Sequence, residues 1–238
     1  MSGKKAAIVT GASQGIGVGL VEAFLNEGYN VVATSRHVSQ SLTGSPSLVL
    51  VDGDIGKQET AAQAVEAAIN YFGTIDVLAN NAGIFRTKPF TDFTTDDFNA
   101  LVSTNLLGFI YITQLTVRQM LKQKSGNVVS ISGALVDQPV EGINASVSMI
   151  TKGGLNAVIR SLAIEYAKEG IRFNAVAPGV VDTPLHKDDP KNSLKTFQPM
   201  GEIVEVKDVV DAVLYLAQAG QVTGEILHVD GGAHAGRW

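Results

Sequence analysis

A serine and a lysine stand four residues apart in the stretch NASVSMITKGG, at positions 144–154. Residues with this spacing share one face of a helix, so Ser148 and Lys152 are expected to lie side by side. An ammonium group can give a proton to a substrate oxygen, either directly or through a held water molecule. The pair therefore indicates a polar reaction site, and it leaves open which group supplies the proton.

A second stretch able to do chemistry is TGASQGIG, at positions 10–17. Glycines at 11, 15 and 17 allow a tight turn and let the backbone approach a ligand closely. The helix that follows points its free N–H groups at the turn, an arrangement that suits a diphosphate. A strand before the turn and an amphipathic helix after it are the context of a dinucleotide site. The alternative is that these glycines serve only strand–helix packing.

The end of the second predicted strand indicates which dinucleotide binds. NAD sites usually place an acidic residue there, about 20 residues beyond the glycine turn, to hold the ribose hydroxyls. This chain has Thr34, Ser35 and Arg36 instead. A guanidinium group fits a 2′-phosphate, so the sequence favours NADP(H) over NAD(H). The alternative is that Arg36 is simply a solvated arginine.

These stretches must be positioned by a regular framework, and short β-branched runs alternate with helical patterns along the chain. The runs show no in–out alternation, which is typical of parallel strands covered on both faces. Strand–helix alternation predicts an α/β fold, a Rossmann-type doubly wound parallel sheet of about seven strands with helices on both faces. The predicted strands are 6–10, 30–34, 48–52, 75–80, 127–132, 172–177 and 225–230, and the longest helices are about 95–124 and 146–169.

Composition limits the classes of function. The chain has 238 residues, 45% of them hydrophobic, a net charge of −5 and no cysteine. An acidic chain has no electrostatic support for binding nucleic acid, and the absence of cysteine excludes disulfides and thiolate ligands. No metal-ligand cluster is evident. Uninterrupted apolar runs fall short of the ~18 residues of a membrane span, so we expect no membrane partner and a cytoplasmic location.

The length fits a single dinucleotide-binding domain over 1–238. Within it, the segment 182–204 is the least regular, with three prolines and dense charge. Because it follows a strand end, we predict a lid over the site, and the alternative is a surface excursion.

Taken together, these motifs resemble the short-chain dehydrogenase/reductase family over essentially the whole chain. TGASQGIG is similar to the family's cofactor turn, and NNAG at 80–83 to the signature beside the central sheet. The resemblance implies that Asn105 holds a water of a proton relay and that Lys152 holds the nicotinamide ribose. It also implies a cofactor site made by Gly11, Ser13, Gln14, Gly15, Ile16, Gly17, Ser35, Arg36, Asp54, Ile55, Asn81, Ala82, Gly83, Lys152, Pro178, Gly179, Val181 and Thr183.

The chain departs from the family pattern at two catalytic positions. The family's tyrosine, the usual proton donor, falls at Ser148, and its catalytic serine falls at Gly133, with Ser132 one place earlier. A serine hydroxyl is a far weaker acid than a phenol and lies nearer the backbone. Substitute donors are Lys152 itself, a residue of the inserted stretch (Asp137, Glu141 or Asn144), or His186 of the predicted lid.

Three functions remain open on these observations. The first is an NADP(H)-dependent oxidoreductase that acts on a small carbonyl or alcohol by a non-standard proton route. It would use Asn105, Lys152, Ser148 and Ser132. The second is a cofactor-binding sensor or regulatory protein without turnover, and the third is a non-redox enzyme on the same fold. Apolar residues on more than one side of the two long helices predict a homo-oligomer, a dimer or a tetramer.

Overall fold

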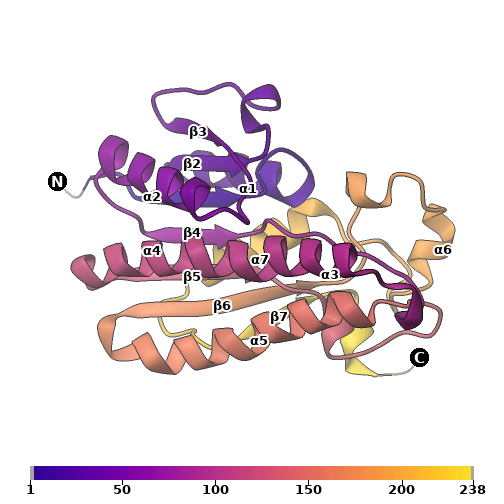
Figure 1. Cartoon of the computed structure of the whole chain (residues 1–238). Helices are drawn as coiled ribbons and strands as arrows, with labels where there is room; N and C mark the ends of the chain where they lie inside the picture. Colours follow the sequence, from indigo (N-terminus) through magenta and orange to yellow (C-terminus); the bar gives the residue numbers. More distant parts are fainter. Residues whose placement is uncertain (1–2, 237–238) are drawn as a thin grey trace.

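The computed structural model describes residues 3–236, which form one parallel sheet between two layers of helices (Figure 1). The strand order is β3-β2-β1-β4-β5-β6-β7, and every neighbouring pair is parallel. The predicted fold class is confirmed. The strands are β1 (Ala6–Thr10), β2 (Asn30–Ser35), β3 (Leu48–Asp52), β4 (Val77–Asn80), β5 (Gly126–Ile131), β6 (Ile171–Pro178) and β7 (Ile226–Val229).

The continuous apolar runs are explained by burial on both faces of the sheet. In β1, Ile8 packs into the core on one side, while Val9 packs into the core on the other. Helices α1 (Gly15–Asn26) and α7 (Val206–Gln218) cover the side of Val9. The side of Ile8 is covered by α2 (Gln58–Phe72), α4 (Gly108–Gln123) and α5 (Ser146–Tyr166).

The helix predicted over about 95–124 is not one regular helix. Thr94 caps α3 (Thr95–Leu101) with a reciprocal capping box to Asp97, as the local residue types predict. A π-helical stretch, η3 (Val102–Leu107), then separates α3 from α4. Such widened turns occur frequently at functional sites, and this one carries the buried Asn105.

The long helical stretch Thr95–Gln123 is apolar on average, although it has no uninterrupted apolar run of membrane-spanning length. Thr95–Gln123 has 29 residues and a mean hydropathy of 1.4 over its most apolar window, which meets the length and composition of a membrane span. Polar residues interrupt its apolar runs, but the mean hydropathy of the window stays in the range of a membrane span. The helix packs against α2 and β5 inside the fold, and 44% of that window is buried. Its apolar character is that of a core helix.

The strand order reverses between β1 and β4, which are neighbours in the sheet but not in the sequence. Ligands of doubly wound proteins bind outside the carboxyl ends of the strands at such a switch point. Here the glycine turn follows β1 and the NNAG motif follows β4. The fold therefore brings together the two motifs that the sequence predicts to contact a cofactor.

Gly17→Ala is predicted to lower the free energy of unfolding by about 1–3 kcal/mol, the usual cost of forcing extra atoms into a packed site. A Cβ atom built on Gly17 would lie 2.1 Å from the carbonyl oxygen of Gly11, so α1 would have to move away from β1. Urea denaturation measures the change. Gly220→Ala, where a Cβ atom meets nothing within 4 Å, should change stability by less than about 0.5 kcal/mol. Equal effects of the two variants would contradict the packing argument.

Candidate active site

A cavity of about 910 Å³ lies at the carboxyl ends of the strands. Among the residues predicted for the cofactor site and the proton relay, leaving aside the substitute donors, Gly17, Asn105 and Ser148 do not line it. All the others do: Gly11, Ser13, Gln14, Gly15, Ile16, Ser35, Arg36, Asp54, Ile55, Asn81, Ala82, Gly83, Ser132, Lys152, Pro178, Gly179, Val181 and Thr183.

Hydrogen bonds connect the glycine turn after β1 to the NNAG motif after β4. Asn81 donates through Nδ2 to the carbonyl oxygens of Thr10 and Gly11, at 2.9 and 3.1 Å. The Thr10 hydroxyl in turn accepts hydrogen bonds from the backbone N–H groups of Asn81 and Ala82. Gly11 and Gly15 both adopt positive φ, at 66° and 54°, which favours glycine.

This turn fits a diphosphate on the structure's own features. The residue before α1 is Gln14, whose side chain makes no capping hydrogen bond, so the first N–H groups of the helix stay available. Ser13, Gln14, Gly15 and Ile16 all line the cavity. A helix N-terminus with free donors and a positive dipole end is suited to an anion.

The end of β2 offers a positive group without an acidic partner from β3. Arg36 is exposed and lines the cavity, next to Ser35, whose buried hydroxyl has no hydrogen-bond partner within residues 3–236. Asp52, at the end of β3, is occupied by Ser39, which donates to it through its backbone N–H and its hydroxyl. These hydrogen bonds lower the pKa of Asp52. The Arg36 guanidinium is therefore available to an anionic ligand.

Lys152 extends from α5 toward the carboxyl end of β5 and lines the cavity. Its Nζ atom donates to the carbonyl oxygen of Ile131 at 2.8 Å. A Cβ atom built on Gly83 would lie 3.2 Å from this Nζ and 3.4 Å from Oδ1 of Asn105, so a side chain at 83 would crowd both groups. Burial lowers the pKa of the Lys152 ammonium from 10.5 to about 8, although the residue keeps one edge on the cavity. Desolvation thus brings the pKa of the ammonium close to neutral pH, where proton transfer is efficient.

Ser148 does not face the cavity. Its side chain is fully buried, and its hydroxyl accepts from the backbone N–H of Arg86 at 3.0 Å and donates to the carbonyl oxygen of the same residue at 2.8 Å. Both functions of the hydroxyl are therefore used by backbone. The structure places Ser148 as an anchor for another segment, and this geometry gives it no route to a substrate.

The anchored segment, residues 84–88, crosses the face of α5 and is hereafter the crossing segment. Asn105 holds its first residue, accepting from the N–H of Ile84 at 2.8 Å and donating to its carbonyl oxygen at 2.9 Å. The N–H of Lys88 donates to the carbonyl oxygen of Asn144 at 2.8 Å. These contacts bind the crossing segment to the π-helical turn, to α5 and to the inserted stretch at once.

The remaining predicted donors are placed unequally. Ser132 donates to Oδ1 of Asn156 at 2.6 Å, so its hydroxyl turns toward α5. Asp137 hydrogen-bonds His228 at 2.8 Å and, like Glu141, does not line the cavity. His186 does line it, and its Nδ1 atom lies 2.8 Å from Oδ2 of Asp189.

The predicted lid contributes one wall of the cavity. It contains η6 (Pro184–His186) and α6 (Lys191–Lys195), and Thr183 lies against the glycine turn, 3.2 Å from a Cβ atom built on Gly15. Gln198 fixes the far end of the segment through Nε2, which donates to the carbonyl oxygens of Val180 and Glu202. The segment is thus folded onto the site in this structure.

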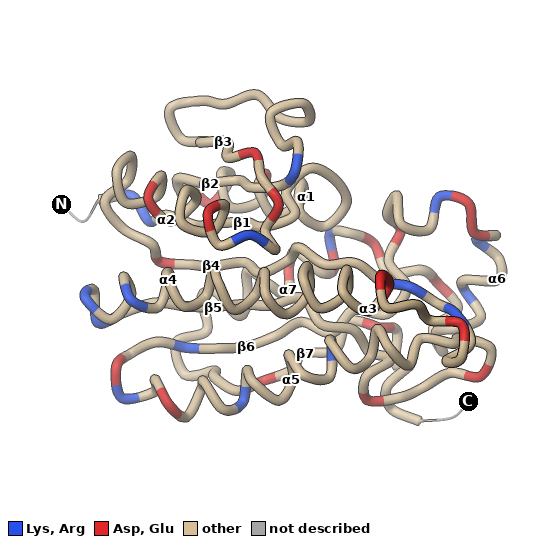
Figure 2. The backbone as a smooth tube through the Cα atoms, in the orientation of Figure 1, with Lys and Arg blue, Asp and Glu red and all other residues tan. Residues whose placement is uncertain are grey.

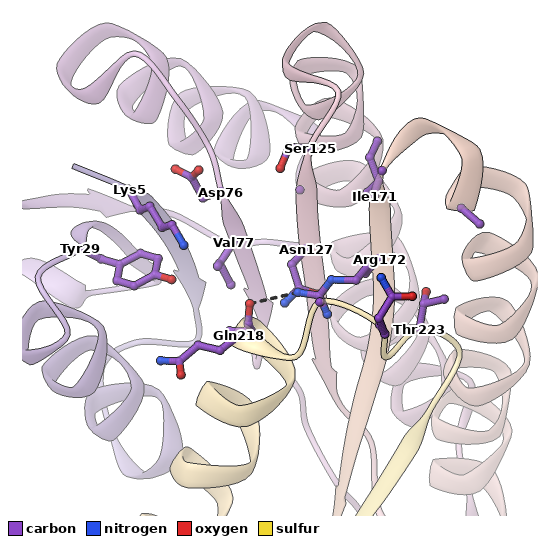
Figure 3. Close-up of a pocket in the computed structure, with 16 residues that line it drawn as sticks. Lys5, Tyr29, Asp76, Val77, Ser125, Asn127, Ile171, Arg172, Gln218 and Thr223 are labelled. Atoms are coloured by element: carbon purple, nitrogen blue, oxygen red, sulfur yellow. Dashed lines mark hydrogen bonds between the residues drawn. The ribbon is translucent and has the colours of Figure 1, made fainter. Parts of the chain in front are cut away.

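A second cavity, of about 620 Å³, opens at the opposite edge of the sheet, where β4, β5 and β6 begin (Figure 3). Its Arg172 donates to the carbonyl oxygens of Leu216 and Ala217, in the last turn of α7. That contact satisfies the end of a helix. The predicted dinucleotide motifs lie at the other edge, so the first cavity is the candidate site.

Sequence reasoning missed the crossing segment and the π-helical turn. Neither has a local signal, because hydrogen bonds to distant parts of the chain fix the path of residues 84–88.

Comparisons with known proteins agree with this geometry. The family model described as enoyl-(acyl carrier protein) reductase matches residues 11–234. The chain is 32% identical over 242 residues to the 3-oxoacyl-acyl-carrier-protein reductase FabG of Escherichia coli, covering 97% of each chain. It is also 32% identical over 231 residues to carbonyl reductase family member 4 of Xenopus laevis, covering 96% of this chain and 97% of the relative.

Solved structures give the same answer. The 3-ketoacyl-(acyl-carrier-protein) reductase of Brucella melitensis, complexed with NADH, superposes with a TM-score of 0.90 and 29% identity, covering 97% of this chain and 98% of that one. ElxO with NADP bound gives a TM-score of 0.89 and 29% identity, covering 98% and 100%.

The sheet order, the glycine turn and the buried lysine define a dinucleotide-dependent oxidoreductase of the doubly wound class. The chain belongs to the short-chain dehydrogenase/reductase family of NAD(P)-dependent enzymes.

Ser148→Ala is predicted to lower the free energy of unfolding by about 1–3 kcal/mol, because it leaves the buried N–H and carbonyl oxygen of Arg86 without partners. Thermal or urea denaturation measures the loss. Ser146→Ala, at an exposed position of the same helix, is the matched control and should change stability by less than about 0.5 kcal/mol. A Ser148→Ala protein as stable as the control would contradict the anchoring role.

Proposed function

We propose that the protein is an NADP(H)-dependent oxidoreductase that interconverts a small carbonyl compound and its alcohol, with Lys152 as the proton donor. The observation that carries this proposal is the Lys152 ammonium, which is buried at the floor of the dinucleotide cavity with its pKa lowered to about 8. The relatives named as 3-oxoacyl reductases and a carbonyl reductase support carbonyl reduction as the reaction type.

The cofactor side of the site supports NADP(H). The free amides at the start of α1 are suited to the diphosphate, and Arg36 is suited to the 2′-phosphate. ElxO is a structural neighbour with NADP bound, whereas the Brucella melitensis enzyme holds NADH. The preference for NADP(H) therefore rests on Arg36 and on the absence of an acidic residue at the end of β2.

The proton route follows from the chain's own groups. The bound cofactor supplies a hydride, and carbonyl reduction then requires a proton at the substrate oxygen. Ser148 is committed to Arg86 and Ser132 to Asn156, whereas Lys152 uses one of its three N–H donors on Ile131 and keeps the others for ligands. Asn105 supports this site indirectly, because it fixes the backbone of the crossing segment next to Lys152.

A second candidate function is a cofactor-binding sensor or regulatory protein without turnover. The observation that favours it is the full commitment of the Ser148 hydroxyl to backbone, which removes a donor at the family's tyrosine position. In that case dinucleotide binding persists while no carbonyl compound is reduced.

Assembly, lid closure and location belong to the same proposal. The α5 helix exposes Ile150 and Ile164 by 55% and 82%, and such apolar surface supports a homo-oligomer, a dimer or a tetramer. The segment 182–204 is proposed to act as a lid over the cofactor and substrate. The cytoplasmic location stays a prediction.

Arg36→Ala is predicted to weaken NADPH binding by about 10–100-fold, because the guanidinium forms charge-assisted hydrogen bonds with the 2′-phosphate. NADH binding should change by less than about threefold, since NADH has no such phosphate. Calorimetric titration of both nucleotides against both proteins measures the difference. Equal losses for NADPH and NADH would count against a 2′-phosphate contact.

The rate of carbonyl reduction is predicted to fall as pH rises through about 8, because only the protonated Lys152 can act as the acid. Alcohol oxidation needs the neutral amine, so its rate should rise through the same range. Profiles of kcat/KM against pH in both directions measure this. Reduction that stays constant to a pH well above 8 would contradict the assignment of Lys152.

A variant separates the two candidate functions. Lys152→Gln should reduce turnover by ~10²–10⁴-fold, the usual contribution of general acid catalysis. Absence of turnover in the wild-type protein, over a panel of ketones, aldehydes and quinones with NADPH binding intact, would favour the sensor instead.

A further inference from the structure

The crossing segment is hydrogen-bonded at Ile84 and at Lys88, and between them it places Arg86 at the cavity. Ser148 binds both backbone groups of Arg86, and Ser148 lies one helical turn before Lys152 on the same face of α5. The backbone of Arg86 is therefore held beside a residue that lies one helical turn before the proposed proton donor. Its side chain lines the cavity and remains 40% exposed.

The charge of Arg86 is only partly neutralised. Its Nη1 atom pairs with Oδ1 of Asp97, but the other oxygen of that carboxylate holds the Lys88 ammonium at 2.6 Å. One carboxylate thus serves two cations, which leaves an excess of one positive charge. Figure 2 shows charged residues of both signs gathered at the beginning of α3, where Asp97 lies.

Asp97 itself is not available to another ligand. Its carboxylate also accepts from the backbone N–H and the hydroxyl of Thr94, at 3.1 and 3.0 Å. The Lys88 ammonium and these Thr94 groups hold the pKa of Asp97 well below its usual range, so the carboxylate stays charged at neutral pH. Arg86 is consequently held in place by a fixed anion.

The Arg86 guanidinium is held by Asp97 and still has N–H donors without a partner in the described part of the chain. Of its five N–H groups, one on Nη1 donates to Asp97, and within residues 3–236 Nη2 and Nε have no hydrogen-bond partner. Lys152 also lines the cavity, Lys88 is paired with Asp97, and Asp189, an acid that lines the same cavity, is paired with His186. The substrate end of the cavity is therefore positively charged.

We propose that Arg86 is a specificity-determining residue that binds the carboxylate of an oxo-acid substrate, so that the protein prefers anionic carbonyl compounds to neutral ones. The proposal rests on the proposed oxidoreductase function and narrows its substrate class. A planar guanidinium with free donors matches a carboxylate in both charge and shape.

The test measures binding rather than turnover, so it does not depend on the proton route. Protein saturated with NADP⁺ is titrated by calorimetry with straight-chain α-keto acids of increasing length and with their methyl esters, which the oxidised cofactor cannot reduce. The wild-type protein should bind the best acid about tenfold or more tightly than its ester. Arg86→Gln should weaken binding of the acid by about 10–100-fold and leave the ester unchanged.

Two further variants guard the interpretation. Lys122→Gln removes one positive charge at the far end of α4 and should keep the preference for the acid. If Arg86→Gln fails to fold, Arg86→Lys serves in its place; it keeps the charge, loses the planar fork and should bind the acid more weakly than wild type.

Three results would overturn the proposal: equal affinity of acid and ester for the wild-type protein, a preference that survives in Arg86→Gln, and no binding of either ligand. The proposed oxidoreductase function is judged separately, by NADPH consumption with neutral ketones and aldehydes. Turnover of neutral compounds without a preference for acids would leave that function standing and remove only the role of Arg86.

Discussion

The close approach of α1 to the end of β1 is the constraint on which the site depends. Gly17 leaves no room for a side chain against the carbonyl oxygen of Gly11, and Asn81 bridges that carbonyl to β4. Helix α1 is thereby aimed at the switch point of the sheet, with its first N–H groups uncapped. The proposed diphosphate site lies at this fixed turn, and Thr183 of the segment 182–204 packs against it.

A second constraint concerns the position where the family carries its tyrosine. Ser148 stands there, and its hydroxyl satisfies both backbone groups of Arg86. Lys152 is then left without a phenol beside it, and burial lowers the pKa of its ammonium to about 8. The same substitution thus removes one acid and, on the proposed mechanism, leaves the lysine to take over its task. The serine also anchors the backbone of Arg86, a residue that lines the cavity.

Much of the fold could be predicted because its signals are local. The strands end within two residues of the predicted ranges. The glycine turn could also be predicted, because its glycines stand where the backbone needs positive φ or a close approach. The π-helical turn at Asn105 and the path of residues 84–88 could not be predicted. They depend on hydrogen bonds between positions 21 and 62 residues apart, for which the sequence has no periodic signal.

The central claim is that a pyridine nucleotide lies across the carboxyl ends of the strands, and calorimetric titration of the wild-type chain with NADPH tests it most directly. The account predicts saturable heat with a stoichiometry of one nucleotide per chain. No heat from NADPH, NADP⁺, NADH or NAD⁺ would contradict it, whatever the fate of the individual residues assigned to the site.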